Sequence, residues 1–430
     1  MSKVSADDFY ILTANAQADE HQRVLKHGET FGVFDSHGDI RPTGLAEEGL
    51  YHEGTRFLSR YQLLIGRARP LFLSSMVKED NAILAVDLTN PDIGRNGDLK
   101  IARGAVHIHR TKFLVEGFCY ERLTFSNYSL EPVRLPLMLH ADCDFADVFE
   151  VRGQVRARRG AILAPRATAN GVILSYEGLD MVVRRSEVSV VPPPARTDGS
   201  TMRFELSLER GKQAFFDVTV GCASRAGRVR APRLPRALAD ARKRVQAERS
   251  RQCLVETSSE PFNHWLRRSR SDLSMMATET PEGPFPYAGV PWFSAPFGRD
   301  ALITALETLW CDPALSRGVL AHLAATQATT DDPIREAQPG KILHEARLGE
   351  MAALAEIPFG RYYGTVDATP LFVVLAGEYL ARTEDLAFIE SIWPNVQAAL
   401  AWLDRSCRPY LSYLAKAKGL VNQGWKDSGD

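Results

Sequence analysis

Aromatic residues stand beside carboxylates in three short segments of the last third of the chain. The segments are PWFSAPFGRDALI at 291–303, YYGTVDATPLF at 362–372 and GLVNQGWKDSGD at 419–430, and two of them place an Arg or a Lys next to the Asp. Flat rings stack on the faces of sugars, while carboxylates and guanidinium groups bind hydroxyls through charge-assisted hydrogen bonds. The three segments therefore predict a pocket for an uncharged ligand that is rich in hydroxyl groups.

The first segment crowds Trp292 and Phe293 beside the pair Arg299 and Asp300, at the point where a helix is expected to begin. An Asp in the first turn of a helix is also an ordinary capping residue that complements the helix dipole. Capping accounts for Asp300 but not for the aromatic side chains and the Arg around it. We interpret Arg299 and Asp300 as a pair that fixes two sugar hydroxyls above an aromatic floor.

The second segment repeats this order of residue types. Tyr363 lies in a loop, and Asp367 opens a strongly apolar helix. One interpretation makes Asp367 a cap and Tyr363 a packing residue. The other makes them a second hydroxyl-binding edge of the same pocket, and the residue types alone leave both open.

Between these two segments lies GKILHEARLGEMAAL at 340–354. It lacks the second His of an HExxH motif, so a zinc protease is not expected. Glu345 and Arg347 form either an exposed ion pair, which contributes little stability, or a part of the pocket lining.

The third segment carries the candidate acid, Asp427, two residues after Trp425. An indole ring that shields a carboxyl group from water raises its pKa, and such a group stays protonated to act as a general acid. The alternative is a polar tail that follows a helical hairpin.

The composition indicates a globular chain of two domains. It has 430 residues, of which 45% are hydrophobic, and 52 basic and 53 acidic residues give a net charge of −1. This balance gives no electrostatic case for binding nucleic acid or an anionic membrane, and no apolar run is long enough to span a bilayer. The cysteines lack metal-ligand spacing and are expected to be buried thiols of a cytoplasmic protein: Cys119, Cys143, Cys222, Cys253, Cys311 and Cys407.

The chain divides into a β part and an α part. Residues 1–230 alternate β-branched and aromatic positions between short polar turns, which predicts a β-sandwich. Residues 231–256 are basic with a helical period and are expected to form a linker helix. Residues 257–430 repeat apolar positions at intervals of three and four, which predicts helices joined by loops rich in Gly, Pro and aromatic residues.

The order of the motifs PWF, FGRD, HEAR, YYG, VDATPLF and GWKDS resembles that of glycogen debranching enzymes and amylo-α-1,6-glucosidases. FGVFDSHGDI, GLYHEGTRFLSRYQL and HADCDFADVFEVRG resemble the β-sandwich of the same group. The resemblance implies a supersandwich-like β domain followed by part of an (α/α)6 toroid. It also implies inverting hydrolysis of α-glucosidic linkages, with the α-1,6 branch of glycogen or a related α-glucan as the expected target and with no metal or organic cofactor.

The resemblance also implies roles for single residues. Asp427 would be the general acid, and Arg299 and Asp300 would grip the terminal sugar. Lining residues would be Trp292, Tyr363, Asp367, Glu345 and Trp425, and the loop 142–152 with Asp142, Asp144, Asp147 and Arg152 would close the pocket from the sandwich side.

The chain departs from the family pattern in its number of helices. It supplies roughly half of those that a toroid needs, and no residue is nominated as the general base, which inverting hydrolysis requires opposite the acid. We therefore expect a truncated or partial gene product that lacks the C-terminal half of the toroid or a complementing chain. A trehalase-like or glucoamylase-like hydrolase and a carbohydrate-binding remnant without catalysis remain alternatives.

Overall fold

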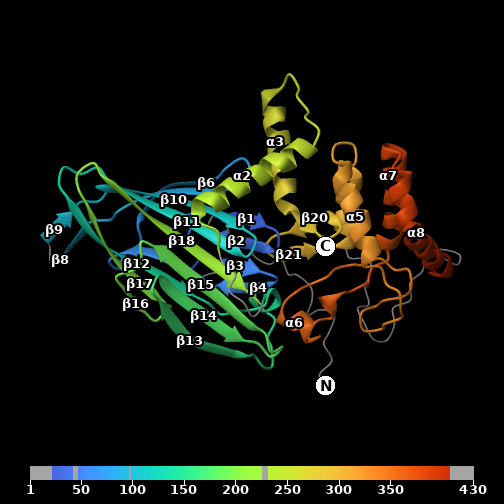
Figure 1. Ribbon diagram of the computed structural model, residues 1–430, viewed down its shortest axis with the longest axis horizontal. Coiled ribbons are helices and arrows are strands. Elements are labelled where there is room, and N and C mark those ends of the chain that lie inside the picture. Colours follow the sequence, from blue (N-terminus) through green and yellow to red (C-terminus); the bar gives the residue numbers. More distant parts are fainter. Residues whose placement is uncertain (1–21, 42–46, 96–97, 225–230, 407–430) are drawn as a thin grey trace, which may run out of the picture. The chain divides into compact units, whose positions relative to one another are not determined.

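The computed structural model describes residues 22–41, 47–95, 98–224 and 231–406. Within them, contacts divide the chain into two compact units (Figure 1). The β unit contains the described residues of 18–247 together with 259–275. The helical unit contains 248–258 and the described residues from 276 onward.

The β unit is built on an antiparallel sheet of eight strands. In the strands at 183–191 and 213–223, buried positions alternate with more exposed ones, because successive side chains point to opposite sides of the sheet. The strands, in their order across the sheet, are β13 (Ala161–Thr168), β14 (Gly171–Glu177), β15 (Val183–Val191), β18 (Gln213–Ala223), β11 (Phe118–Asn127), β10 (Val106–Val115), β7 (Leu84–Thr89) and β6 (Leu71–Val77).

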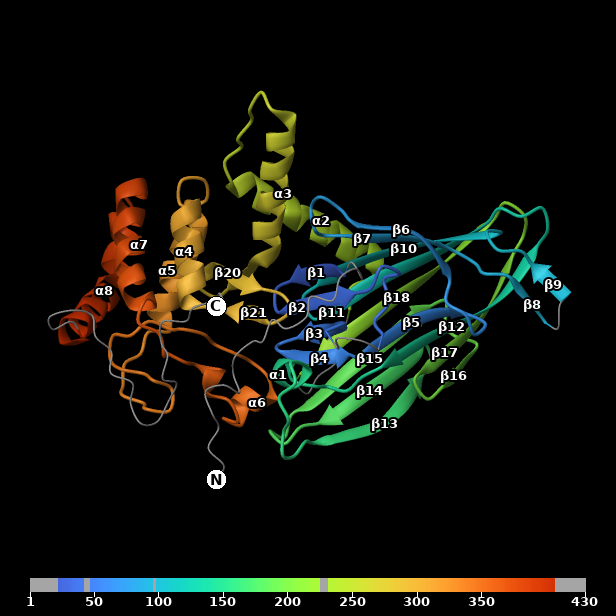
Figure 2. The ribbon, with the colours of Figure 1, turned by 180° about the vertical axis from the view of Figure 1, so that it is seen from behind.

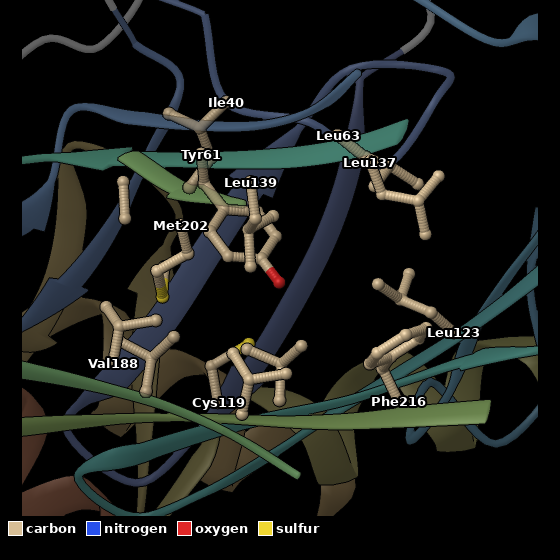
Figure 3. Close-up of a cluster of buried hydrophobic side chains, with 14 of the residues drawn as sticks. Ile40, Tyr61, Leu63, Cys119, Leu123, Leu137, Leu139, Val188, Met202 and Phe216 are labelled. Carbon is tan, nitrogen blue, oxygen red and sulfur yellow. The ribbon is translucent and has the colours of Figure 1, made fainter. Parts of the chain in front are cut away.

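A four-stranded sheet covers the buried face of the large sheet and completes a sandwich-like core. Its order is β16 (Arg196–Asp198), β17 (Thr201–Leu208), β12 (Val133–Asp142) and β5 (Arg60–Ile65). In β17 every second residue, from Met202 to Leu208, is buried. Figure 3 shows Tyr61, Leu63, Leu137, Leu139 and Met202 facing Cys119, Leu123, Val188 and Phe216 across the core.

Shorter elements complete the β unit. A second four-stranded sheet contains β1 (Arg23–His27), β2 (Thr30–Phe34), β3 (Gly49–His52) and β4 (Thr55–Leu58). A two-stranded hairpin contains β8 (Ile93–Arg95) and β9 (Asp98–Ile101), and α1 (Val148–Val151) is a single helical turn.

A group of charged side chains is buried between the loop after β2 and strands β10 and β11; we call Asp39, Arg110, Lys112 and Glu121 the buried charge cluster. Arg110 Nη1 lies 2.5 Å from Asp39 Oδ1, and Arg110 Nε lies 2.7 Å from Glu121 Oε1. Lys112 Nζ lies 2.7 Å from the other oxygen of Glu121. All four side chains are almost inaccessible to solvent. A buried charge requires compensation inside the protein, and here each charged group lies next to a group of opposite charge.

Two helices also belong to the β unit. α2 (Leu234–Arg251) buries Leu234, Ala237 and Ala241 against an aromatic group on β10 and β11 that includes Phe113 and Tyr120 (Figure 1). α3 (Glu260–Met276) is tied to the β6–β7 turn by the Asn81 amide, which donates to the Asp272 carboxylate at 2.7 Å. The segment expected to be a linker helix is thus helical and packs on the sheet.

The helical unit begins with a three-stranded sheet of β19 (Ala277–Thr280), β20 (Gly283–Gly289) and β21 (Phe293–Pro296). Helix α4 packs against α5 and α7, and α7 packs against α8 (Figure 2). The helical elements are α4 (Gly298–Thr308), α5 (Pro313–Ala325), α6 (Glu350–Ala353), the 3₁₀ turn η2 (Pro358–Gly360), α7 (Ala368–Thr383) and α8 (Leu386–Ser406). Among the described residues, none of the helices is long and apolar enough to cross a membrane.

The expected order of a sandwich-like β part followed by helices is confirmed. The toroid, the supersandwich details and the domain bounds 1–230, 231–256 and 257–430 stay predictions. The sheet β19–β20–β21 was not predicted, because its Gly- and Pro-rich sequence reads as loop. The expectation of buried thiols holds for Cys119 and Cys222 but is wrong for Cys253, which is exposed.

Candidate functional site

Two backbone segments meet where α4 begins. The Gly298 N–H donates to the His344 carbonyl at 2.8 Å, and a β-bridge joins Phe297 to Glu345. A Cβ atom at position 298 would lie 1.9 Å from the Leu343 carbonyl oxygen, so only glycine permits this approach. A second bridge joins Glu345 to Tyr362, which brings the three segments 297–300, 344–347 and 362–367 together.

Arg299 lies between two carboxylates at this junction. Its Nε is 3.8 Å from Asp300 Oδ2, and its Nη1 is 3.7 Å from Asp367 Oδ2. The side chains of Asp300 and Asp367 are 33% and 30% exposed, whereas that of Arg299 is 13% exposed. Arg299 is less exposed than the two carboxylates, whose exposed oxygen atoms can accept hydrogen bonds from the hydroxyls of a ligand.

The structure places both carboxylates at the starts of helices, as the capping interpretation expects, but Asp367 makes no capping hydrogen bond. Helix α4 begins at Gly298 with Phe297 at the N-cap position, so Asp300 lies within the first turn and the helix has no side-chain cap. Asp367 occupies the N-cap position of α7, but its side chain makes no capping hydrogen bond. One oxygen of Asp367 instead accepts from the Thr365 hydroxyl at 2.5 Å.

Glu345 and Arg347 form a buried ion pair, so the interpretation as an exposed surface pair is wrong. Arg347 Nη2 lies 3.3 Å from Glu345 Oε2, both side chains are 6% exposed, and Arg347 Nη1 donates to the Trp292 carbonyl at 2.9 Å. Through this bond to the Trp292 carbonyl, Arg347 holds the backbone of the aromatic segment. Whether either group contacts a sugar stays a prediction.

Aromatic rings surround this pair. Phe297 packs edge-on against Phe293 and His344 at 5.8 Å between ring centroids, and the Arg347 guanidinium lies 5.3 Å from the centre of the Phe297 ring. Phe293 is 37% exposed and Trp292 is half-buried, which leaves aromatic surface in the segment that leads to Arg299. Tyr363 is buried, and its hydroxyl donates to the Thr326 carbonyl at 2.7 Å.

His344 is a site residue that the sequence did not identify. Burial, reinforced by the charges of Arg299, Arg347 and Lys341, lowers the pKa of His344 to about 3. The imidazole is therefore neutral at physiological pH and packs between Phe297 and Tyr362. The sequence indicates Glu345, the neighbour of His344 in the motif HEAR, as a site residue. It does not indicate His344, because the burial of the imidazole depends on residues that are distant in the sequence.

The remaining candidates lie elsewhere. Asp427 and Trp425 fall outside the described residues. In the loop 142–152, Asp147 accepts from the Phe149 N–H in a capping box at the start of α1, and Asp144 pairs with Arg56. These contacts give Asp144 and Asp147 structural partners within the β unit. The part of Asp142 and Arg152 in closing a pocket stays a prediction.

Among the described residues, no three or more His, Cys, Asp or Glu side chains are grouped so as to hold a metal ion. The site consists of carboxylates, the guanidinium groups of Arg299 and Arg347, and aromatic rings. These groups can bind hydroxyls and stack on a sugar ring.

Comparison with known proteins adds a family. Residues 25–219 match the family model of the N-terminal domain of some glycogen debranching enzymes. This part of the chain belongs to that domain family. The resemblance stated from the motifs is thereby confirmed for the debranching-type N-terminal domain. A comparison with curated protein sequences gives no match.

Solved structures show what the debranching-type domain and the helices that follow it are similar to. A structure described as a kojibiose phosphorylase from the human microbiome aligns over 88% of this chain with a TM-score of 0.57 and 10% identity. The chain spans 56% of the length of that structure. A bacterial glucoamylase in complex with acarbose aligns over 91% of this chain and 67% of its own, with a TM-score of 0.45 and 11% identity. At such low identity the likeness to the phosphorylase structure concerns the fold alone.

Proposed function

We propose that this chain belongs to a glycoside hydrolase that acts on α-glucosidic linkages, with the α-1,6 branch of glycogen or a related α-glucan as its target. The observation that carries the proposal is Arg299 between the partly exposed carboxylates of Asp300 and Asp367, in a segment that also carries the exposed ring of Phe293. The debranching-type domain at 25–219 supports a glucan as the ligand.

The proposed reaction is inverting hydrolysis. A carboxylic acid protonates the glycosidic oxygen while a carboxylate on the opposite face of the sugar activates water. By its place in the motif GWKDS, Asp427 is the proposed acid, and Arg299, Asp300 and Asp367 are the proposed grip on the terminal sugar. Trp292 and Phe293 supply the stacking surface.

The first experiment measures product release from a branched limit dextrin, with maltose, isomaltose and trehalose in parallel. The chain is compared with a form extended through its reading frame, and each reaction is run with and without inorganic phosphate. Glucose from the limit dextrin and isomaltose supports the proposal. Release from trehalose or maltose alone would replace it by a different hydrolase, and glucose 1-phosphate formed only in phosphate would replace it by a phosphorylase.

Variants connect the activity to the site. Asp427→Asn is expected to abolish hydrolysis while sugar binding persists, because the amide cannot donate the proton. Asp300→Asn and Asp367→Asn are each expected to weaken sugar binding by about tenfold or more, the loss of one charge-assisted hydrogen bond. Asp404→Asn, an exposed position on α8, is the matched control. Unchanged affinity in both site variants would remove the Arg299 cluster from the binding site.

A further inference from the structure

Two cysteines from distant parts of the sequence lie side by side in the helical unit. Cys253 lies in the segment that follows α2, and Cys311 lies in the turn between α4 and α5. The Cys253 N–H donates to the Cys311 carbonyl at 3.1 Å. In an antiparallel pair, residues that exchange backbone hydrogen bonds have Cα atoms about 5.5 Å apart, and a disulfide bond spans roughly 4.4–6.8 Å. The single bond from Cys253 to Cys311 brings the two residues near this range.

The turn that holds Cys311 is fixed by its own hydrogen bonds. The N–H groups of Cys311 and Asp312 donate to the Thr308 carbonyl at 2.9 and 2.8 Å. The Asp312 side chain caps α5 by accepting from the Leu315 N–H at 3.3 Å. The Cys311 thiol donates to the Thr308 carbonyl at 3.3 Å. Because these hydrogen bonds hold Cys311 in place, less conformational entropy is lost when a disulfide bond between Cys311 and Cys253 closes.

Access to solvent separates this pair from the two cysteines in the core of the β unit. Cys253 is exposed and Cys311 is partly exposed, whereas Cys119 and Cys222 are buried in the core of the β unit. Reaction of a thiol with a dissolved reagent depends on access. We propose that Cys253 and Cys311 form a modification site that reacts with low-molecular-weight disulfides and closes to a Cys253–Cys311 bond.

The reaction balances as two exchange steps. The Cys253 thiolate attacks one sulfur of the small disulfide, so that a mixed disulfide forms on Cys253 and one thiol leaves. Cys311 then loses its proton and attacks the Cys253 sulfur, which releases the second thiol. The protein loses two hydrogens and is oxidised, and the small disulfide is reduced to two thiols.

The test uses oxidised glutathione on the native chain, followed by alkylation and peptide mass mapping. The expected product is one cross-linked peptide pair that contains Cys253 and Cys311, with an intact mass lower by two hydrogens, and dithiothreitol should reverse it. Cys311→Ser should stop the reaction at a glutathione adduct on Cys253. Cys253→Ser should suppress formation of the bond, and Cys143→Ser, at another partly exposed cysteine, should react like the wild type.

Two results would overturn the proposal. One is a wild-type chain that keeps glutathione on Cys253 and forms no internal bond. The other is a cross-link that joins Cys253 to a different cysteine. Thermal unfolding gives an independent readout, because a bond that fits the existing backbone should raise the melting temperature by a few degrees. A lower melting temperature in the oxidised form would show that the pair is not preorganised. The inference does not depend on glycosidase activity.

Discussion

Arg110→Met removes the central cation of the buried charge cluster and keeps a side chain of similar length. Arg110 is fully buried and also donates to the backbone carbonyls of His37 and Gly38, at 2.8 and 3.1 Å. The substitution leaves Asp39 and Glu121 inside the protein with one cation fewer. Because the loop at residues 35–39 is attached to β10 through Arg110, its anchoring should weaken as well.

The size of the effect follows from the partners that remain. Lys112 Nζ stays 2.7 Å from Glu121, and Arg69 Nη2 stays 2.9 Å from Asp39, so each carboxylate keeps one positive neighbour. Breaking a buried pair typically costs about 3–5 kcal/mol. We expect the lower end, about 3 kcal/mol of unfolding free energy, since neither charge is left alone.

The pH dependence provides a second signature of the same change. Burial alone would raise the pKa of Glu121, but the charges of Arg110 and Lys112 outweigh it and hold that pKa at about 2. A pKa below its unfolded value stabilises the folded state above that unfolded value, about 4.3, and this stabilisation is lost as the pH falls toward 2. Without Arg110 the pKa of Glu121 rises, so acid unfolding should begin at a higher pH.

The assay is urea unfolding followed by far-UV circular dichroism and by tryptophan fluorescence. The fluorescence reports mainly on the helical unit, which contains Trp292, Trp310, Trp393 and Trp402, whereas Trp265 lies in the β unit. Arg122→Met is the matched control: Arg122 pairs with Asp217 at 2.7 and 2.8 Å, but its side chain is 38% exposed. An exposed pair of this kind contributes about 0–1 kcal/mol. Equal losses in the two variants, or a loss below about 1 kcal/mol for Arg110→Met, would refute the reasoning from burial.

Two further predictions concern the helical unit. Gly298→Ala should destabilise the helical unit, because the new Cβ would meet the Leu343 carbonyl. Gly377→Ala, at an open position of α7, should stabilise that unit by about 0.5–1 kcal/mol. Thermal or urea unfolding measures both changes, and changes of the same sign in the two variants would contradict the close approach at Gly298. His344→Gln should flatten the fall in stability as the pH drops from about 6.5 toward 3, because the buried His344 takes up its proton only on unfolding in that range. Unfolding titrations of the variant and the wild type measure it, and identical slopes would show that His344 is already protonated in the folded chain.

Local sequence patterns predicted single helices and strands, but they did not predict which side chains these elements bury against one another. In β10 the alternation of Val106, Ile108, Arg110 and Lys112 places all four side chains on the inner face. The sequence shows charges on an apolar face, but their partners come from other segments, and Asp39 lies 71 residues away. The periodic pattern of a single strand cannot reveal a pairing between residues so far apart in the sequence.

The candidate site shows the same limit. Asp300 and Asp367 follow aromatic residues in similar segments, and from this likeness both were expected at one pocket. The structure brings both carboxylates to Arg299, and the pocket stays a prediction. Burial of Glu345 could not be read from the motif HEAR, since an ion pair two residues apart has the same sequence whether it is exposed or covered. Its partner Arg347 contacts the Trp292 carbonyl and the Phe297 ring, which come from a segment some fifty residues earlier.

The contact between Gly298 and the Leu343 carbonyl has a consequence for how this site can evolve. It is a junction of main chain with main chain, so the spacing between the start of α4 and the HEAR segment does not depend on the choice of any side chain. Selection for a different sugar therefore acts on the rings and carboxylates that this frame presents, while the frame itself tolerates one residue type at position 298. A library that varies Phe293, Asp300 and Asp367 but fixes Gly298 would explore ligand preference at little risk to folding.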